Sequence, residues 1–162
     1  MTSATFSDRV ETWQAQGRME SFRGHSIHTF YRDGTGPLLV LLHGFPTSSF
    51  DWREFLKVDT KRSVLAFDFL GFGLSDKPRD HSYTLSWQAD LTEELVLRYG
   101  NARPVHLVAH EYGEDLVGFH TVFHHHLEQA ACFRIHGRFP ELLGVHLAQP
   151  FVALDFRALA AE

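Results

Sequence analysis

The amino-acid sequence predicts an α/β fold in which helices cover both faces of a mostly parallel β-sheet. Two continuous apolar runs, "LLVLLHG" at 38–44 and "SVLAFDF" at 63–69, are typical of strands that are buried on both faces. A segment with helical spacing at 83–99 separates the second run from a further strand-like run, "PVHLVAH", at 104–110. Because strands that alternate with helices join through right-handed crossovers, this order predicts a parallel sheet between two layers of helix.

The first elements of the chain predict a hairpin followed by a strand, a helix and a second strand. The segment at 21–34 has two short strand-like runs around Gly24 and closes at the turn signal "DGTGP". Residues 50–58 have the spacing of a short helix between the two buried strands, and residues 71–81, "GFGLSDKPRDH", have the composition of a loop.

The later part of the chain continues this alternation. The helix predicted at 83–99 has an apolar face and a charged face. The apolar face consists of Leu85, Ala89, Leu91, Leu95 and Val96, and the charged face consists of Glu93, Glu94 and Arg98. A second helix is expected at about 113–128 and a strand at 131–136, "ACFRIH". The complete order is therefore a regular alternation of strands and helices after the hairpin.

Length, charge and cysteine content limit the classes of function. At 162 residues, a single domain over 1–162 is expected. The net charge of −5 and the scattered Lys and Arg residues argue against a nucleic-acid partner. Cys132 is the single cysteine, so no internal disulfide is expected, which fits the cytoplasm. The longest apolar run, at 37–45, is far shorter than the about 20 residues that cross a bilayer, so no membrane partner is expected.

Three segments fall at the carboxyl ends of predicted strands, where ligands of open parallel sheets bind. They are residues 43–46, residues 68–73 and Glu111. The segment "VHLVAHEYGED", at 105–115, predicts a sharp turn from strand to helix at Glu111. Such a turn exposes its central side chain, which in the G-x-S-x-G form is a nucleophile faced by backbone N–H groups that stabilise an oxyanion. Glu111 is therefore the candidate nucleophile.

Two other patterns each have a structural and a functional interpretation. His120 and His124 are four residues apart, as metal ligands on one helix face are, but no third ligand follows at a suitable spacing. We therefore expect no metal site. Trp52 and Trp87 either line a pocket or belong to the core, as large aromatic residues next to a sheet commonly do.

Three ordered motifs together resemble the N-terminal half of an α/β-hydrolase. They are "HGFPTSSFDWRE" at 43–54, "AFDFLGFGLSDKP" at 66–78 and "VHLVAHEYG" at 105–113. The resemblance covers residues 22–140, leaves 141–162 as a divergent tail, and is closest to the branch with epoxide hydrolases, haloalkane dehalogenases and mesoderm-specific-transcript-like proteins. It implies a truncated α/β-hydrolase fold with an N-terminal hairpin and no lid domain.

The resemblance also implies roles for particular residues. In that branch the nucleophile is an aspartate that attacks carbon, and Glu111 aligns with it. The backbone N–H groups of Phe45 and Tyr112 would form the oxyanion hole. His43 and His110 are similar to the histidines that brace these two turns. The resemblance implies a hydrolase of small apolar esters, epoxides or alkyl halides that needs no cofactor.

Two departures from the family leave a second interpretation open. Glutamate adds one methylene, which shifts the carboxylate by about 1.5 Å, and a misplacement of about 1 Å can cost ~10²-fold in rate. The family's catalytic histidine lies in a C-terminal half that the motifs do not reach. Asp155 is a weak candidate for the acid and His146 for the base. The alternative is a non-catalytic interaction or scaffold protein that keeps the front half of the fold.

The edge of the predicted sheet bears on assembly. In the family the strand that matches residues 131–136 is internal to the sheet, so here its outer edge needs a partner. The segment "PFVALDF" at 150–156 has strand character. It either caps this edge within its own chain or exchanges with a second copy to give a homodimer. In both arrangements, residues 151–156 are expected to be ordered.

Overall fold

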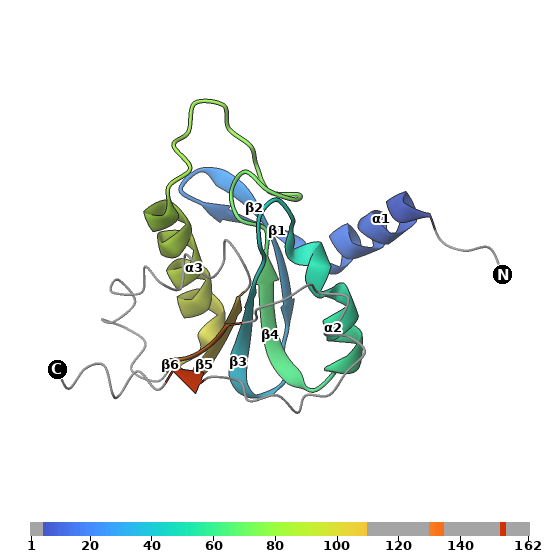
Figure 1. Ribbon diagram of the computed structural model, residues 1–162, viewed down its shortest axis with the longest axis vertical. Coiled ribbons are helices and arrows are strands. Elements are labelled where there is room, and N and C mark those ends of the chain that lie inside the picture. The colour runs from blue at the N-terminus through green and yellow to red at the C-terminus, as the bar shows by residue number, and fades with distance from the viewer. Residues whose placement is uncertain (1–4, 110–129, 135–152, 155–162) are drawn as a thin grey trace.

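A computed structural model describes residues 5–109, 130–134 and 153–154 of the protein, which form a sheet with helices on both faces (Figure 1). The elements are α1 (Phe6–Gln16), β1 (Arg18–Phe22), β2 (His25–Arg32), β3 (Thr35–Leu42), the 3₁₀ helix η1 (Ser49–Trp52), α2 (Arg53–Val58), β4 (Arg62–Phe67), α3 (Leu85–Gly100), β5 (Val105–Ala109), β6 (Ala130–Arg134) and β7 (Ala153–Leu154).

The sheet is parallel at its centre and antiparallel at its edges. Its strand order is β1-β2-β4-β3-β5-β6-β7. β4, β3, β5 and β6 run parallel to their neighbours in this group, whereas the β1–β2 hairpin and β7 pair antiparallel with the strands beside them. The predicted α/β class, the hairpin and the parallel centre are therefore confirmed.

The two central strands are buried on both faces because their side chains alternate between two cores. Leu38, Val40 and Leu42 of β3 pack in the core that α3 covers. Leu39 and Leu41 point the other way, into the core with Trp13 of α1, Trp52 of η1 and Leu56 of α2. Successive side chains of an extended strand point to opposite faces of the sheet. Because both faces of β3 are covered by a core, every position in its buried part needs an apolar side chain.

The predicted helix at 83–99 is confirmed as α3, which begins two residues later than expected. Thr84 is its N-cap, and the Thr84 side chain accepts a hydrogen bond from the backbone N–H of Trp87 at 3.2 Å. Thr and Ser favour this position because their oxygen satisfies a backbone donor that the first turn leaves free. On the predicted apolar face, Leu85 is partly buried. The other four residues of this face are buried, namely Ala89, Leu91, Leu95 and Val96.

Helix α1 was not predicted from the sequence. Thr5 and Asp8 form a capping box, in which each side chain accepts a hydrogen bond from the backbone N–H of the other. Trp13 fixes the helix to the sheet, because its side chain is 4% exposed and stacks on Phe30 of β2 with ring centroids 5.1 Å apart. One buried aromatic side chain therefore anchors the helix on the face of the sheet to which Leu39 and Leu41 of β3 also contribute.

The outer edge of β6 is capped within the chain. Cys132 and Phe133 of β6 are register partners of Leu154 and Ala153 of β7. This confirms pairing of the tail with the edge at these residues. The rest of the segment at 151–156 lies outside the described residues, and the homodimer stays a prediction. The helix predicted at 113–128 lies outside the described residues.

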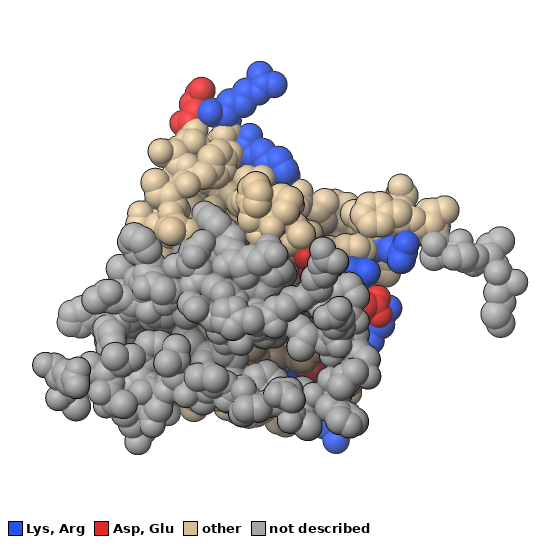
Figure 2. Space-filling model, in the orientation of Figure 1, with Lys and Arg blue, Asp and Glu red and all other residues tan. Residues whose placement is uncertain are grey.

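The charged side chains of the described surface are mixed in sign. Figure 2 shows basic and acidic side chains near one another on the described part of the face in view. Within the described residues, none of the helices has the length and apolar content that a membrane span requires. The same part of the chain contains no group of three or more His, Cys, Asp or Glu side chains placed to hold a metal ion.

Candidate active site

The carboxyl ends of three strands lie side by side at one edge of the sheet. Leu42 of β3 is the register partner of Ala109 of β5, and Leu41 of β3 is the register partner of Ala66 of β4. The loops that follow these strands therefore leave the sheet at the same edge, where ligands bind in this class of fold. The loop at 43–48 follows β3, and the loop at 68–84 follows β4.

His43 joins the first loop to the second. Its side chain is fully buried, and its Nε2 accepts a hydrogen bond from the backbone N–H of Phe69 at 3.0 Å. Since Nε2 is the acceptor, the proton of the neutral ring lies on Nδ1, which is 2.8 Å from the carbonyl oxygen of Gly44. Both ring nitrogens are thus engaged with backbone groups of the two loops. This is the geometry of a histidine that braces a loop.

Phe45 presents an aromatic side chain at this edge. The side chain is 61% exposed and meets the ring of Phe72 edge to face, with centroids 6.1 Å apart. Phe72 in turn contacts the ring of His43 at 5.5 Å. The two loops therefore contribute adjoining apolar rings, one of which contacts the buried imidazole.

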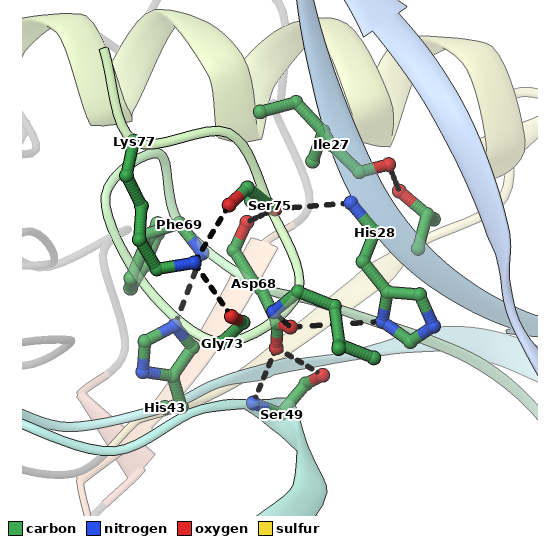
Figure 3. Close-up of polar contacts among 11 residues, drawn as sticks. Ile27, His28, His43, Ser49, Asp68, Phe69, Gly73, Ser75 and Lys77 are labelled. Carbon is green, nitrogen blue, oxygen red and sulfur yellow. Dashed lines mark hydrogen bonds and ion pairs between the residues drawn. The ribbon is translucent and has the colours of Figure 1, made fainter. Parts of the chain in front are cut away.

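Asp68 is the polar centre that holds the two loops together (Figure 3). Its side chain is 1% exposed. Its Oδ1 accepts hydrogen bonds from the backbone N–H of Ser49 at 2.8 Å and from the Ser49 hydroxyl at 2.5 Å. Its Oδ2 accepts one from the backbone N–H of Leu74 at 2.7 Å. One carboxylate thus fixes the start of η1 and the middle of the loop after β4.

Side chains within the loop after β4 also donate hydrogen bonds to backbone carbonyl groups at its start and along it. The hydroxyl of Ser75 donates a hydrogen bond to the carbonyl oxygen of Asp68 at 2.7 Å. The ammonium group of Lys77 donates to the carbonyl oxygens of Gly73 at 2.7 Å and Ser75 at 2.9 Å. Figure 3 shows Lys77 reaching across the loop to Gly73 and Ser75, beside Asp68. The loop therefore has a defined shape beside the candidate site.

Ser75, His28 and Asp68 have the residue types of a hydrolase triad, but their geometry differs from one. All three side chains are buried. The Ser75 hydroxyl accepts from the backbone N–H of His28 at 3.0 Å, so its contact with this residue is not through the imidazole. A triad requires the imidazole nitrogen to bond to an accessible hydroxyl. The cluster is therefore structural.

The structure describes some of the predicted site residues and not others. Trp52 is 2% exposed and lies in the core with Trp13 and Leu56, while Trp87 is partly buried and meets Phe22 edge to face at 4.9 Å. The binding role predicted for Trp52 stays a prediction. The following candidates lie outside the described residues: His110, Glu111, Tyr112, His146 and Asp155.

Asp68 was not singled out from the sequence as the residue that joins the loops. The signal that could have found it was an acidic residue directly after a buried strand, followed by Gly71 and Gly73. Gly73 has a φ of +49° and packs against Asp68, so that a Cβ atom there would lie less than 3.0 Å from the carboxylate. A glycine is required at such a close approach.

Comparisons with known proteins agree with this architecture. The model of the alpha/beta hydrolase family matches residues 39–137. The mouse mesoderm-specific transcript protein is 36% identical over 150 residues, which cover 83% of this chain and 44% of the relative. The chain therefore spans less than half of the length of this relative.

Solved structures show the same similarity. A haloalkane dehalogenase from Agrobacterium tumefaciens superposes with a TM-score of 0.59 at 30% identity, over 72% of this chain and 40% of that chain. A variant epoxide hydrolase from Vigna radiata superposes with a TM-score of 0.61 at 27% identity, over 75% of this chain and 38% of that chain. The resemblance deduced from the three sequence motifs is confirmed.

Proposed function

The chain belongs to the α/β-hydrolase family, and on that basis we propose that it hydrolyses small apolar esters, epoxides or alkyl halides through an acidic nucleophile at Glu111. In this proposal, the turn after β5 presents the Glu111 carboxylate at the edge of the sheet where β3 and β5 end. The backbone N–H groups of Phe45 and Tyr112 stabilise the oxyanion that forms during hydrolysis.

The proposed reaction has two steps. A carboxylate oxygen of Glu111 attacks a carbon atom of the substrate, and the bond from that carbon to the epoxide oxygen or halide breaks. The opened epoxide oxygen takes a proton from water, or the halide departs with its electron pair, and an alkyl ester of Glu111 remains. A water molecule that has lost a proton to a base then cleaves the ester and restores the carboxylate. His146 is the weak candidate for the base and Asp155 for its acid partner.

With an ester substrate, attack at the carbonyl carbon expels the alkoxide, which takes a proton from water. The acyl group remains on Glu111 as a mixed anhydride, which water then cleaves in the same way.

One observation carries the proposal. Leu42 and Ala109 are register partners, so the backbone that leads to Phe45 and the backbone that leads to Glu111 leave adjacent strands at the same edge. The buried His43 braces the first of these paths through its bonds to Gly44 and Phe69. The exposed ring of Phe45 and the adjoining ring of Phe72 supply an apolar surface there, which suits a substrate without charge.

Turnover of a panel of substrates tests the proposal. The unaltered protein and Glu111→Gln are incubated with a p-nitrophenyl ester, an aryl epoxide and a bromoalkane, and the products are quantified. We expect the amide to abolish turnover, because it cannot act as the nucleophile. Glu114→Gln is the matched control, since it removes a carboxylate elsewhere in the same short segment. Equal turnover by the unaltered protein and Glu111→Gln would refute the role of Glu111.

The alternative function is a non-catalytic interaction protein. It is favoured by the glutamate itself, whose carboxylate extends one methylene beyond that of the family's aspartate. Glu111→Asp separates the two functions, because it restores the shorter side chain. An impaired hydrolase should gain rate with this substitution, whereas an interaction protein should show no turnover with either residue.

A further inference from the structure

His28 is a buried polar side chain whose contacts the proposed reaction does not use. It lies in β2 and its side chain is 1% exposed. Within the described residues, neither of its ring nitrogens has a hydrogen-bond partner. Leaving buried polar atoms without such partners costs stability, and an apolar residue of similar size would avoid the cost. The imidazole therefore calls for an explanation other than packing alone.

The ring of His28 lies between α1 and Asp68. On one side it meets the ring of Trp13 at a centroid distance of 6.3 Å. Gly17, the C-cap residue of α1, is so close that a Cβ atom there would lie less than 3.0 Å from Nε2. On the other side, Nδ1 is 3.7 Å from Oδ2 of Asp68. This distance exceeds that of a hydrogen bond and lies within the range of an ion pair, and Figure 3 shows the two groups facing each other.

Other charged groups around Asp68 have different partners. The carboxylate of Asp76 accepts a hydrogen bond from the backbone N–H of Ser26 at 2.7 Å. The ammonium group of Lys77 is bound to the carbonyl oxygens of Gly73 and Ser75. Among the described residues, His28 is the basic side chain that meets the Asp68 carboxylate at ion-pair distance. Its Nδ1 is thus placed to act on the same oxygen that holds Leu74.

We propose that His28 is a positioning residue that connects α1 to the two loops of the candidate site through Asp68. Trp13 and Gly17 confine the imidazole from the side of α1, and the imidazole confines the carboxylate that holds Ser49 and Leu74. The position of these loops then depends on how α1 is docked on the sheet. This inference goes beyond the proposed hydrolysis, since it holds whether or not Glu111 is a nucleophile.

Amide hydrogen exchange of the full chain tests the inference. Three substitutions are compared: His28→Leu removes the polar group and keeps the bulk, His28→Asn keeps a polar nitrogen near the position of Nδ1, and His28→Gln moves it towards the position of Nε2. In the Leu and Gln variants, we expect the amides of Ser49 and Leu74 to exchange about tenfold faster than in the unaltered protein. In His28→Asn, protection of both amides should be restored to within about twofold.

Two amides whose hydrogen-bond acceptors are not Asp68 serve as internal controls. The amide of Phe69 is bound to His43 and that of Ser26 to Asp76. Both should keep their rates within about twofold in every variant. Trp13→Leu removes the aromatic side chain that packs α1 on the sheet. Like His28→Leu, it should accelerate amide exchange at Ser49 and Leu74.

The outcomes separate positioning from stability. Unchanged exchange at Ser49 and Leu74 in His28→Leu and His28→Gln would overturn the proposal. Equal acceleration of all four amides would also overturn it, because it would mark a general loss of stability. If His28→Leu does not fold, the contrast between His28→Asn and His28→Gln decides the question by itself, since both are neutral amides that differ in where the nitrogen lies.

Discussion

Gly73 packs so closely against Asp68 that a Cβ atom on Gly73 would lie less than 3.0 Å from the carboxylate. The φ of Gly73 is +49°, a value that residues with a side chain adopt at a cost. The loop after β4 can therefore reach the buried carboxylate only because this position lacks a side chain. The same contact makes the loop sensitive to the smallest substitution.

Gly73→Ala should lower the free energy of unfolding by about 2–4 kcal/mol, because left-handed strain and a steric clash act together. Urea denaturation measures the loss. Gly24→Ala is the matched control, since Gly24 also has a positive φ, +83°, but nothing lies within 4 Å of the position that its Cβ atom would take. The control should lose only about 1 kcal/mol. Equal losses in the two variants would show that the clash with Asp68 contributes nothing.

Ser49→Ala removes the hydroxyl that donates to the buried carboxylate of Asp68. Hydrogen bonds to charged groups contribute about 1.5–3 kcal/mol, so a loss of stability in this range is expected. The backbone N–H of Ser49 still donates to the same oxygen, which keeps the loop closed. Denaturation of Ser49→Ala and of Ser82→Ala, which alters an exposed serine, gives the comparison. A change within about 0.5 kcal/mol in both variants would contradict the importance of this hydroxyl.

Arg103→Lys should destabilise the protein although it keeps the charge. The guanidinium of Arg103 donates hydrogen bonds to the carbonyl oxygen of Gly100 at 3.2 Å, to Asp33 at 3.2 Å and to the hydroxyl of Tyr31 at 3.1 Å. Lysine cannot reproduce this planar fork. We expect a loss of about 1–3 kcal/mol in thermal or urea unfolding, against no measurable change for the exposed Arg79→Lys. Retention of full stability by Arg103→Lys would contradict this account of the turn that leads into β5.

Glu20 should make part of the stability depend on pH. Burial raises the pKa of Glu20. Hydrogen bonds from Tyr99 and Arg98, together with the positive charges of Arg18 and Arg98, lower it by more than burial raises it, so the pKa lies below the ordinary 4.5. A carboxyl group whose pKa is lowered by folding stabilises the protein above its unfolded pKa, and this contribution is lost as the pH falls through the folded pKa.

Comparison with Glu20→Gln measures this contribution. The unaltered protein should be more stable than Glu20→Gln at about pH 7, and the difference in unfolding free energy should shrink as the pH falls below the ordinary carboxyl range. Thermal unfolding between about pH 3 and pH 7 is the measurement. A difference in unfolding free energy that stays constant over this pH interval would show that the negative charge of Glu20 does not contribute to stability.

The sheet could be predicted from sequence because burial leaves a direct pattern. The runs of β3 and β4 contain no polar residue at their centres, since alternate side chains enter two different cores. The first helix could not be found by the same route. Its one buried side chain is Trp13, so its apolar spacing is weak, and the signal that remained was the capping pair Thr5 and Asp8.

The polar centre of the site was harder to predict. Asp68 follows β4 in the sequence, but its partners Ser49, Leu74 and His28 depend on the conformation of two loops and on the order of the strands. β2 lies beside β4 in the sheet, which brings His28 to Asp68 although β3, η1 and α2 lie between these two strands in the sequence. Such contacts arise from tertiary structure and leave no local pattern.

The proposed role of Glu111 as the nucleophile is tested most directly by intact and peptide mass spectrometry of acid-quenched protein after incubation with a small aryl epoxide. The proposal predicts that the peptide with Glu111 gains the mass of one epoxide molecule, because the ring opens onto the carboxylate without loss of atoms. The same peptide of Glu111→Gln should gain nothing. Absence of the adduct in the unaltered protein during turnover, or an equal gain in both proteins, would contradict the proposed function.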